Sequence, residues 1–232
     1  MPTPSQITKI EKGLREYRKK YLTKKQNLEV DESATRIMVN SLLTSVFGYA
    51  ELDDIKTEYN IRGTYADYVI QLARKKHIVV EVKSIQLDLS SNHLRQAVGY
   101  AADEGIDWVL LTNGRQVKLY KVLFGKPVTR HLVFDYNLAD LTTIKKAAAD
   151  MTYLSKKCVQ KGELDEYWKR FDALTPASIV KAIYTEDVIR AIRLRLKKNC
   201  GMNFDQNDVI DAVQEVLVKG FDGGGRPRVL RK

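Results

Sequence analysis

The sequence predicts an α/β protein in which a mixed β-sheet is flanked by helices and followed by a helical C-terminal extension. Residues 56–134 contain runs of β-branched and aromatic residues, separated by turn signals and interrupted by one helical segment. A helical pattern precedes this region, and helical patterns alone follow it. We therefore expect an α/β core with a basic N-terminal helix over residues 1–137, a helical extension over 138–222, and a flexible basic tail over 223–232.

Composition and charge narrow the class of protein. The chain has 232 residues, 44% hydrophobic and 29% charged, and can bury a core of ordinary size. Its 2 cysteines are far apart, which excludes a disulfide scaffold and fits a reducing, cytoplasmic location. No apolar run could span a membrane, so we expect no membrane contact. The net charge of +10 favours a polyanionic partner, and nucleic acid is the first candidate.

The first expected element is a helix over residues 7–26. Apolar residues recur there at helical spacing, and lysines and arginines cover the remaining faces. A solvated helix face is the plain explanation of these charges. The alternative is a helix that contacts nucleic-acid phosphates, with Lys12, Arg15 and Lys19 as candidate contacts.

A second helix should begin at Asp31, a favourable N-cap, and end near Gly48. Glu32 lies in its first turn, where a negative charge suits the helix dipole. Strands should follow over residues 56–61, 65–72 and 77–84. The tight connection before the last of them carries three basic residues, Arg74, Lys75 and Lys76.

The rest of the core should consist of one helix and several strands. A helix over residues 92–103, capped by Ser90, should lead into a strand over residues 108–112. Asn113-Gly114 is a strong hairpin signal, so the chain should return as the neighbouring strand. The returning strand and one more strand are expected over 116–123 and 128–134. Helices are expected over 139–157 and 163–171, after Thr175 and Thr185, and over 208–219.

Charged residues interrupt the most apolar of these strands. Alternation along residues 77–84 places Glu81 and Lys83 on one face. Burial of charge is costly unless the charge is paired or bound to a metal. If the preceding turn is centred near Lys75, Asp67 lies opposite Lys83, with Glu81 one diagonal step away. Two carboxylates and one ammonium group should therefore converge on neighbouring strands.

Such a group suits hydrolysis of a phosphodiester. Carboxylate oxygens are hard ligands for Mg²⁺, which can bind a phosphate oxygen and lower the pKa of a water molecule. Lys83 would position that water or offset developing negative charge. The alternative without catalysis is a cross-strand ion pair between Asp67 and Lys83 on a wet sheet face, with Glu81 solvated.

A set of ordered segments resembles a known family. Asp67 followed by Glu81-Val82-Lys83 resembles the PD-(D/E)XK nuclease motif, with Ala66 in place of the motif proline. More narrowly, residues 30–124 resemble the N-terminal nuclease domain of the type I restriction enzyme R subunit. The segments that carry this resemblance are Asp31-Glu-Ser-Ala-Thr-Arg36, Tyr65-Ala-Asp-Tyr-Val-Ile70, Val79-Val-Glu-Val-Lys-Ser84, Leu94-Arg-Gln-Ala-Val-Gly-Tyr-Ala101 and Leu111-Thr-Asn-Gly114.

The resemblance implies a restriction-endonuclease-like sheet and a role for individual residues. Asp67 and Glu81 would bind Mg²⁺, with Mn²⁺ as a substitute, and Lys83 would serve catalysis. Glu32 matches a glutamate that supports the metal site, although a helix-dipole role explains this residue as well. Gln96 and Tyr100 match the family's Gln-x-x-x-Tyr motif and are assigned to catalysis, against the alternative of a polar helix edge.

The expected function follows from this resemblance and from what the chain lacks. No Gly-x-x-x-x-Gly-Lys-[Ser/Thr] loop occurs in the sequence, so we expect no ATP motor. We predict a stand-alone Mg²⁺-dependent DNA endonuclease, whose protein partners would be restriction-modification subunits or a second copy. The DNA backbone would be held by basic residues, namely Lys12, Arg15, Lys19, Arg74, Lys75 and Lys76. The alternatives are a non-cleaving nucleic-acid-binding or assembly module on the same fold, and a structural protein whose charge serves only solubility.

Overall fold

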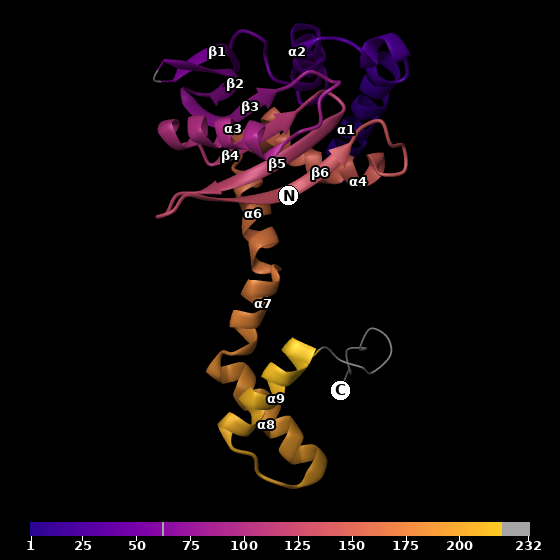
Figure 1. Ribbon diagram of the computed structural model, residues 1–232. Helices are drawn as coiled ribbons and strands as arrows, with labels where there is room; N and C mark the ends of the chain where they lie inside the picture. Colours follow the sequence, from indigo (N-terminus) through magenta and orange to yellow (C-terminus); the bar gives the residue numbers. More distant parts are fainter. Residues whose placement is uncertain (62, 220–232) are drawn as a thin grey trace. The chain divides into compact units, whose positions relative to one another are not determined.

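Figure 1 shows the computed structural model of the chain, which describes residues 1–61 and 63–219. The expected basic tail at residues 223–232 lies outside the described residues. Contacts within the chain divide it into two compact units, Met1–Lys169 and Arg170–Lys232. The first unit contains the β-sheet and its flanking helices, and the described part of the second unit is helical.

Among the described residues, a six-stranded mixed sheet forms the centre of the first unit, with the strands in chain order. The strands are β1 (Ile55–Ile61), β2 (Thr64–Leu72), β3 (Lys75–Val82), β4 (Trp108–Thr112), β5 (Gln116–Leu123) and β6 (Thr129–Asn137). β3 and β4 run parallel, and the other neighbours are antiparallel. The expected mixed α/β sheet is therefore confirmed.

The hairpin between β2 and β3 has a tighter turn than the sequence predicts. Its turn residues Ala73 and Arg74 have positive φ angles of 47° and 68°, as in the two-residue turns that match strand twist. The turn is thus centred before Lys75, and a bulge within β2 shifts the register by a further residue. As a result Tyr68 pairs with Val80.

Helix α3 (Ser91–Glu104) connects the parallel strands β3 and β4, because a parallel pair needs a crossover connection. Ser90 caps the helix as expected, and its hydroxyl accepts a hydrogen bond from the backbone of His93. Gly105 ends the helix with a φ angle of 65°. α3 packs on one face of the sheet through an apolar cluster that includes Val79, Leu94, Ala97, Tyr100, Val109 and Leu111.

Of the helices before the sheet, the first begins at Pro4 and not at residue 7, whereas the second follows its cap at Asp31 and ends near Gly48 as expected. α1 (Pro4–Tyr17) continues into the π-helical turn η1 (Arg18–Leu22), so the first helical segment ends before residue 26. The short 3₁₀ turn η2 (Lys25–Leu28) precedes α2 (Glu32–Ser41), which continues into η3 (Leu42–Val46). Asp31 caps α2 as expected and accepts from the backbone N–H of Ala34 at 2.8 Å. α1 packs against α4, and the Tyr17 hydroxyl donates to the Gly114 carbonyl at 2.7 Å.

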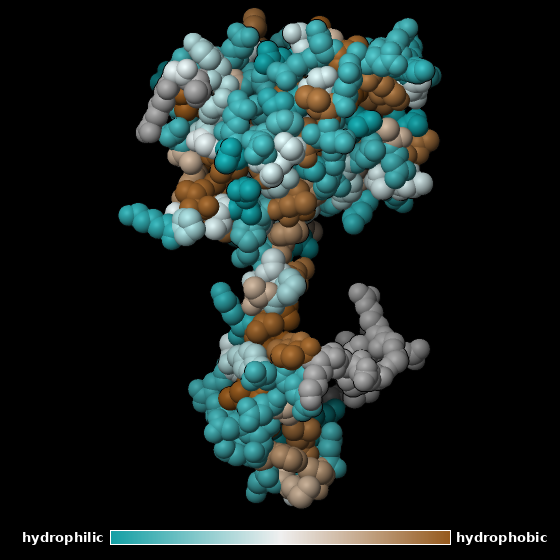
Figure 2. Space-filling model, in the orientation of Figure 1, coloured by the Kyte–Doolittle hydropathy of each residue, from teal (hydrophilic) through white to brown (hydrophobic). Residues whose placement is uncertain are grey.

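The chain after β6 is helical, as expected. Its elements are α4 (Ile144–Met151), η4 (Thr152–Leu154), α5 (Lys156–Gln160), α6 (Glu163–Ala173), α7 (Pro176–Ile183), α8 (Glu186–Cys200) and α9 (Gln206–Lys219). α4 and α5 belong to the first compact unit, which extends past residue 137. In the second unit α8 packs against α7 and α9 around the buried Ile189, while other apolar side chains reach the surface (Figure 2). No helix in the described ranges combines the length and apolar character that a membrane crossing requires.

Candidate functional site

The candidate site lies where β2 and β3 separate. The paired ladder of these strands ends at Tyr68. Continued by one residue, the register places Asp67 opposite Glu81, so the expected position of Asp67 opposite Lys83 is wrong. The two-residue turn and the bulge account for the difference. Beyond the ladder, Oδ2 of Asp67 accepts the backbone N–H of Val82 at 2.7 Å, so a side chain supplies the acceptor that a strand backbone normally provides.

Asp67 is buried, and both of its carboxylate oxygens have partners. Oδ1 accepts from the guanidinium group of Arg36 on α2, which compensates the buried negative charge. Arg36 also pairs with Oε1 of Glu32 at 3.2 Å, one helical turn earlier. Glu32 is therefore connected to the site through Arg36. Glu32 was expected near the site, whereas Arg36 was not, because its contact with Asp67 forms only when the tertiary fold brings α2 to β2.

Glu81 is the most deeply buried charged residue of the site, with a relative exposure of 1%. Its Oε1 accepts from Nζ of Lys83 at 2.7 Å, whereas Oε2 is buried and has no hydrogen-bond partner in the described part of the chain. Burial raises the pKa of Glu81 from its ordinary value of 4.5 to about 7. Lys83 lowers the pKa, and the nearby charges of Asp67 and Glu32 raise it again.

Lys83 is held in its charged form by this carboxylate. Burial alone would lower the pKa of Lys83, but the hydrogen bond and the charge of Glu81 more than offset that effect, so its pKa lies above the ordinary value. The site thus combines a fixed ammonium group, a carboxylate with one free oxygen, and a second carboxylate next to it.

The donor set fits a hard cation that keeps water or substrate oxygens as additional ligands. Mg²⁺ is commonly held by one or two protein carboxylates with water molecules and phosphate oxygens. Glu81 offers the free Oε2, and Asp67 lies opposite it. A cluster of three or more His, Cys, Asp or Glu side chains arranged for a metal ion does not occur among residues 1–61 and 63–219. A site built here would therefore depend on two carboxylates.

Gln96 and Tyr100 on α3 are joined to each other, because Nε2 of Gln96 donates to the Tyr100 hydroxyl at 2.8 Å. Tyr100 is buried in the apolar cluster that contains Val79, which precedes Glu81 by two positions on β3. In the described ranges, no hydrogen bond joins either motif residue to Glu81 or to the lysine beyond it. α3 thus packs over the face of β3 that carries Glu81, and its motif residues form a pair of their own.

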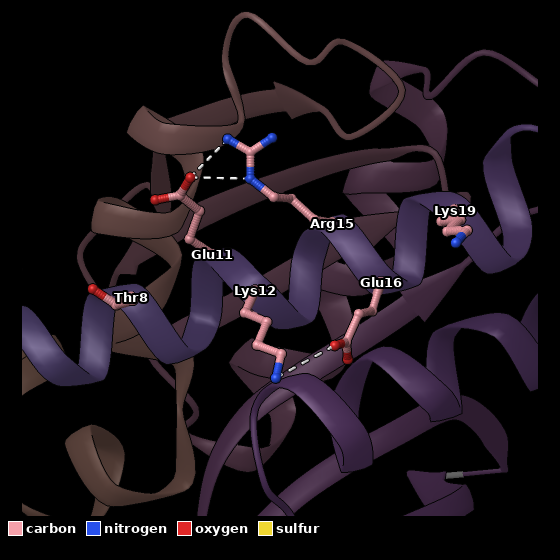
Figure 3. A pocket seen from close by; sticks show the side chains of 6 residues that line it. All are labelled: Thr8, Glu11, Lys12, Arg15, Glu16 and Lys19. Carbon is pink, nitrogen blue, oxygen red and sulfur yellow. Dashed lines mark hydrogen bonds and ion pairs between the residues drawn. The ribbon is translucent and has the colours of Figure 1, made fainter.

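The predicted nucleic-acid contacts on the first helix are partly neutralised (Figure 3). Arg15 pairs with Glu11 at 2.7 Å, and Lys12 lies 3.9 Å from Glu16. Lys19 follows in η1, and together with Lys12 and Arg15 it lines a shallow surface hollow. Ion pairs at this spacing contribute about 0.2–0.5 kcal/mol each to an isolated helix. Arg15 and Lys12 therefore contribute to the stability of α1, and contact of all three basic residues with DNA stays a prediction.

The basic residues of the β2–β3 turn differ among themselves. Arg74 and Lys75 are exposed. Lys76 pairs with Glu104 of α3, and its ammonium group lies 4.7 Å from the ring centre of Tyr59. Lys76 thus fastens α3 to the sheet, and Arg74 and Lys75 are the members of this group that are free to meet a ligand.

Sequence reasoning missed a second ionic cluster on the sheet. Nζ of Lys121 on β5 lies 2.8 Å from Oδ2 of Asp107 and 3.4 Å from Oδ1 of Asp165. It also lies 4.7 Å from the ring centre of Trp108, whose indole N–H donates to Asp165 at 2.9 Å. Strict alternation along β5 places Lys121 on the same face as the buried Leu119. This alternation was the sequence feature that could have indicated a buried, paired lysine.

The resemblance noted in the sequence agrees with a comparison against protein families. Residues 31–130 match the family model of the type I restriction enzyme R protein N terminus (HSDR_N). The match begins at the cap of α2 and ends within β6, so it includes Asp67, Glu81 and Lys83. No curated protein and no solved structure shows significant similarity to the chain. The segment that contains the candidate site is therefore similar to the N-terminal domain of the R subunit of type I restriction enzymes.

Proposed function

We propose that the chain is a metal-dependent DNA endonuclease of the type I R-subunit nuclease type, which acts in the cytoplasm. The observation that carries this proposal is the largely buried Glu81–Lys83 pair, with its unpartnered Oε2, opposite Asp67. The match of residues 31–130 to the R-protein family supports it. Mg²⁺ is the proposed cofactor, with Mn²⁺ as a substitute.

In this proposal Asp67 and Glu81 hold the metal ion, and Glu32 supports the site from α2. When bound, such an ion supplies Lewis acidity toward a phosphodiester. Lys83, fixed by Glu81, offsets the negative charge that develops at phosphorus. Arg36 compensates the charge of Asp67, so a cation that binds Oδ1 would share this oxygen with the guanidinium group or displace it.

The motif residues on α3 and the basic surface complete the proposal. Gln96 and Tyr100 would offer hydrogen-bond donors to the scissile phosphate or to the region of Lys83. The basic residues of α1, η1 and the β2–β3 turn would hold the DNA backbone without reading its sequence. Restriction-modification subunits, or a second copy of the chain, are the proposed protein partners.

The test is a cleavage assay on the full chain with supercoiled plasmid and single-stranded DNA, in Mg²⁺, in Mn²⁺ and in EDTA. We expect cleavage only with a divalent metal, and loss of cleavage in Asp67→Asn and Lys83→Ala. Asparagine at position 67 still offers an acceptor to the backbone of Val82, so this variant removes charge with little change to the sheet. Lys126→Ala, in an exposed loop, is the matched control. Cleavage that persists in both site variants would mean that the chosen site is wrong.

One observation favours the alternative of a non-cleaving nucleic-acid-binding or assembly module. Asp67 already has a cationic partner in Arg36, so the fold is electrostatically complete at this carboxylate without a metal ion. No cleavage by the wild type in either metal, together with salt-sensitive DNA binding, would select this alternative.

A further inference from the structure

Helix α8 carries a row of basic side chains on one face. Arg190, Arg193 and Lys197 are separated by three and four residues, so they project from the same side of the helix. With Asn203, in the segment after the helix, they line a hollow of about 210 Å³. The row lies in the second, helical unit, outside the candidate site.

The positive charge of this row has no compensating ion pair among the described residues. In the part of the chain that the structure describes, no carboxylate lies within ion-pair distance of Arg190, Arg193 or Lys197. Nε of Arg193 donates to the Phe204 carbonyl at 3.1 Å, which holds the side chain beside the hollow and leaves its charge unpaired. Glu186 lies one helical turn before Arg190 on the same side of α8, but among the described residues the two side chains form no ion pair.

The helix dipole explains only part of this arrangement. Cations near a helix C-terminus are stabilising within the last turn. Lys197 lies in the last turn of α8, whereas Arg190 and Arg193 precede it. Interaction with the helix dipole therefore does not explain the positions of Arg190 and Arg193.

The basic face of α1 is a useful contrast (Figure 3). There Lys12 and Arg15 each have a glutamate within 4 Å, one helical turn away. Attraction for an external polyanion depends on charge that is not already matched nearby. The row on α8 is thus the stronger candidate for a phosphate contact.

We propose that this face of α8 binds the phosphate backbone of nucleic acid, as a surface additional to the endonuclease function proposed above. Arginine donates to phosphate oxygens in a forked geometry, and such contacts do not depend on base sequence. Arg190 and Lys197 are about 10 Å apart along the helix axis at 1.5 Å per residue, enough to meet successive phosphates. The concave hollow, with its basic side chains, suits a phosphate group better than the flat surface of a bilayer.

The test measures DNA binding by the full chain in EDTA, so that the result does not depend on cleavage. Anisotropy of a labelled duplex is followed against salt for the wild type and for the triple variant Arg190→Gln, Arg193→Gln and Lys197→Gln. The control triple, Lys161→Gln, Lys169→Gln and Lys181→Gln, changes exposed lysines and lowers the net charge from +10 by the same three units. We expect the slope of log K against log salt to fall by about 2–3 in the α8 variant and to stay near the wild-type value in the control.

Because Arg193 also holds the Phe204 carbonyl, the double variant Arg190→Gln with Lys197→Gln is measured in parallel. It keeps that hydrogen bond and should lower the slope by about 2. Equal slopes in the α8 and control variants would overturn the proposal, as would absence of duplex binding by the wild type at low salt. Binding by α8 to anionic phospholipid vesicles instead of the duplex would also overturn it, in favour of a membrane surface.

Discussion

Lys83 and Lys121 are both largely buried on the central sheet, but their surroundings differ. Lys121 contacts two aspartates and the face of Trp108, and the aspartates are half exposed to water. Lys83 contacts Glu81, which is buried and has one oxygen without a partner among residues 1–61 and 63–219. A fully satisfied network stabilises a fold, whereas an unsatisfied buried oxygen has an energetic cost that calls for a ligand or a proton.

The two clusters also lie at opposite ends of the parallel strand pair. Lys121 pairs with Trp108, the first residue of β4. Lys83 follows Val82, the last residue of β3, which pairs with Thr112 at the end of β4. In open α/β sheets ligands bind beyond the carboxyl ends of parallel strands, which is the end that carries Lys83. The comparison predicts that the Lys83 cluster serves function and the Lys121 cluster serves stability.

The largest effect should come from Lys83→Met. We expect cleavage to fall by about 10³-fold, as in the loss of one preorganised electrostatic group, while the free energy of unfolding changes by about 1 kcal/mol or less. Loss of the ammonium group lets the buried Glu81 hold a proton instead of a charge, which limits the cost to the fold. Initial cleavage rates and urea unfolding measure the two quantities. A large loss of stability with normal cleavage would mean that the Lys83 cluster serves stability and not function.

Lys121→Met should show the opposite pattern. We expect a loss of about 2 kcal/mol in the free energy of unfolding, below the 3–5 kcal/mol typical of a broken buried ion pair, because both aspartates are partly solvated. Cleavage by the folded protein should be unchanged. Urea unfolding checks this, with Lys126→Met as an exposed control that should stay within about 0.5 kcal/mol of the wild type. An unchanged stability would show that the cluster is not the structural one.

Glu81→Gln should change how the free energy of unfolding depends on pH. The folded-state pKa of about 7 lies above the ordinary value of 4.5, so the folded protein binds more protons than the unfolded chain between these values. The wild type should therefore lose stability as pH rises through this window. Glutamine removes this dependence, so the stability of the variant relative to the wild type should rise by about 2–3 kcal/mol between pH 5 and pH 8, because each pKa unit corresponds to about 1.4 kcal/mol. Urea unfolding of both proteins at the two pH values measures this effect. If the stability difference between variant and wild type is the same at both pH values, Glu81 is not the source of the pH dependence.

Local signals were sufficient to predict most elements of the fold. Caps at Asp31 and Ser90 and the turn at Gly114 lie where the sequence indicates, because each depends on residues a few positions apart. The register of β2 with β3 was predicted wrongly. Its turn uses Ala73 and Arg74, which carry no marked turn preference, and the bulge in β2 has no clear sequence signal.

The candidate site could be predicted only in part. Charged residues within an apolar strand indicated that Asp67, Glu81 and Lys83 would gather, and they do lie together. The contact of Arg36 with Asp67 joins a helix to a strand 31 residues away, and no periodicity reveals such a contact. In the described ranges Oε2 of Glu81 has no partner, which is a property of tertiary packing that the sequence does not show.

The hydrogen bond from the Val82 backbone to the Asp67 side chain has a consequence for how this protein can change over time. Asp67 completes the hydrogen bonding between β2 and β3, in addition to belonging to the polar cluster. A lineage that loses the proposed cleavage activity cannot replace Asp67 freely. An aliphatic residue at this position would leave the backbone N–H of Val82 without a hydrogen-bond acceptor. We expect inactive descendants to keep aspartate or asparagine at this position long after the neighbouring lysine has drifted.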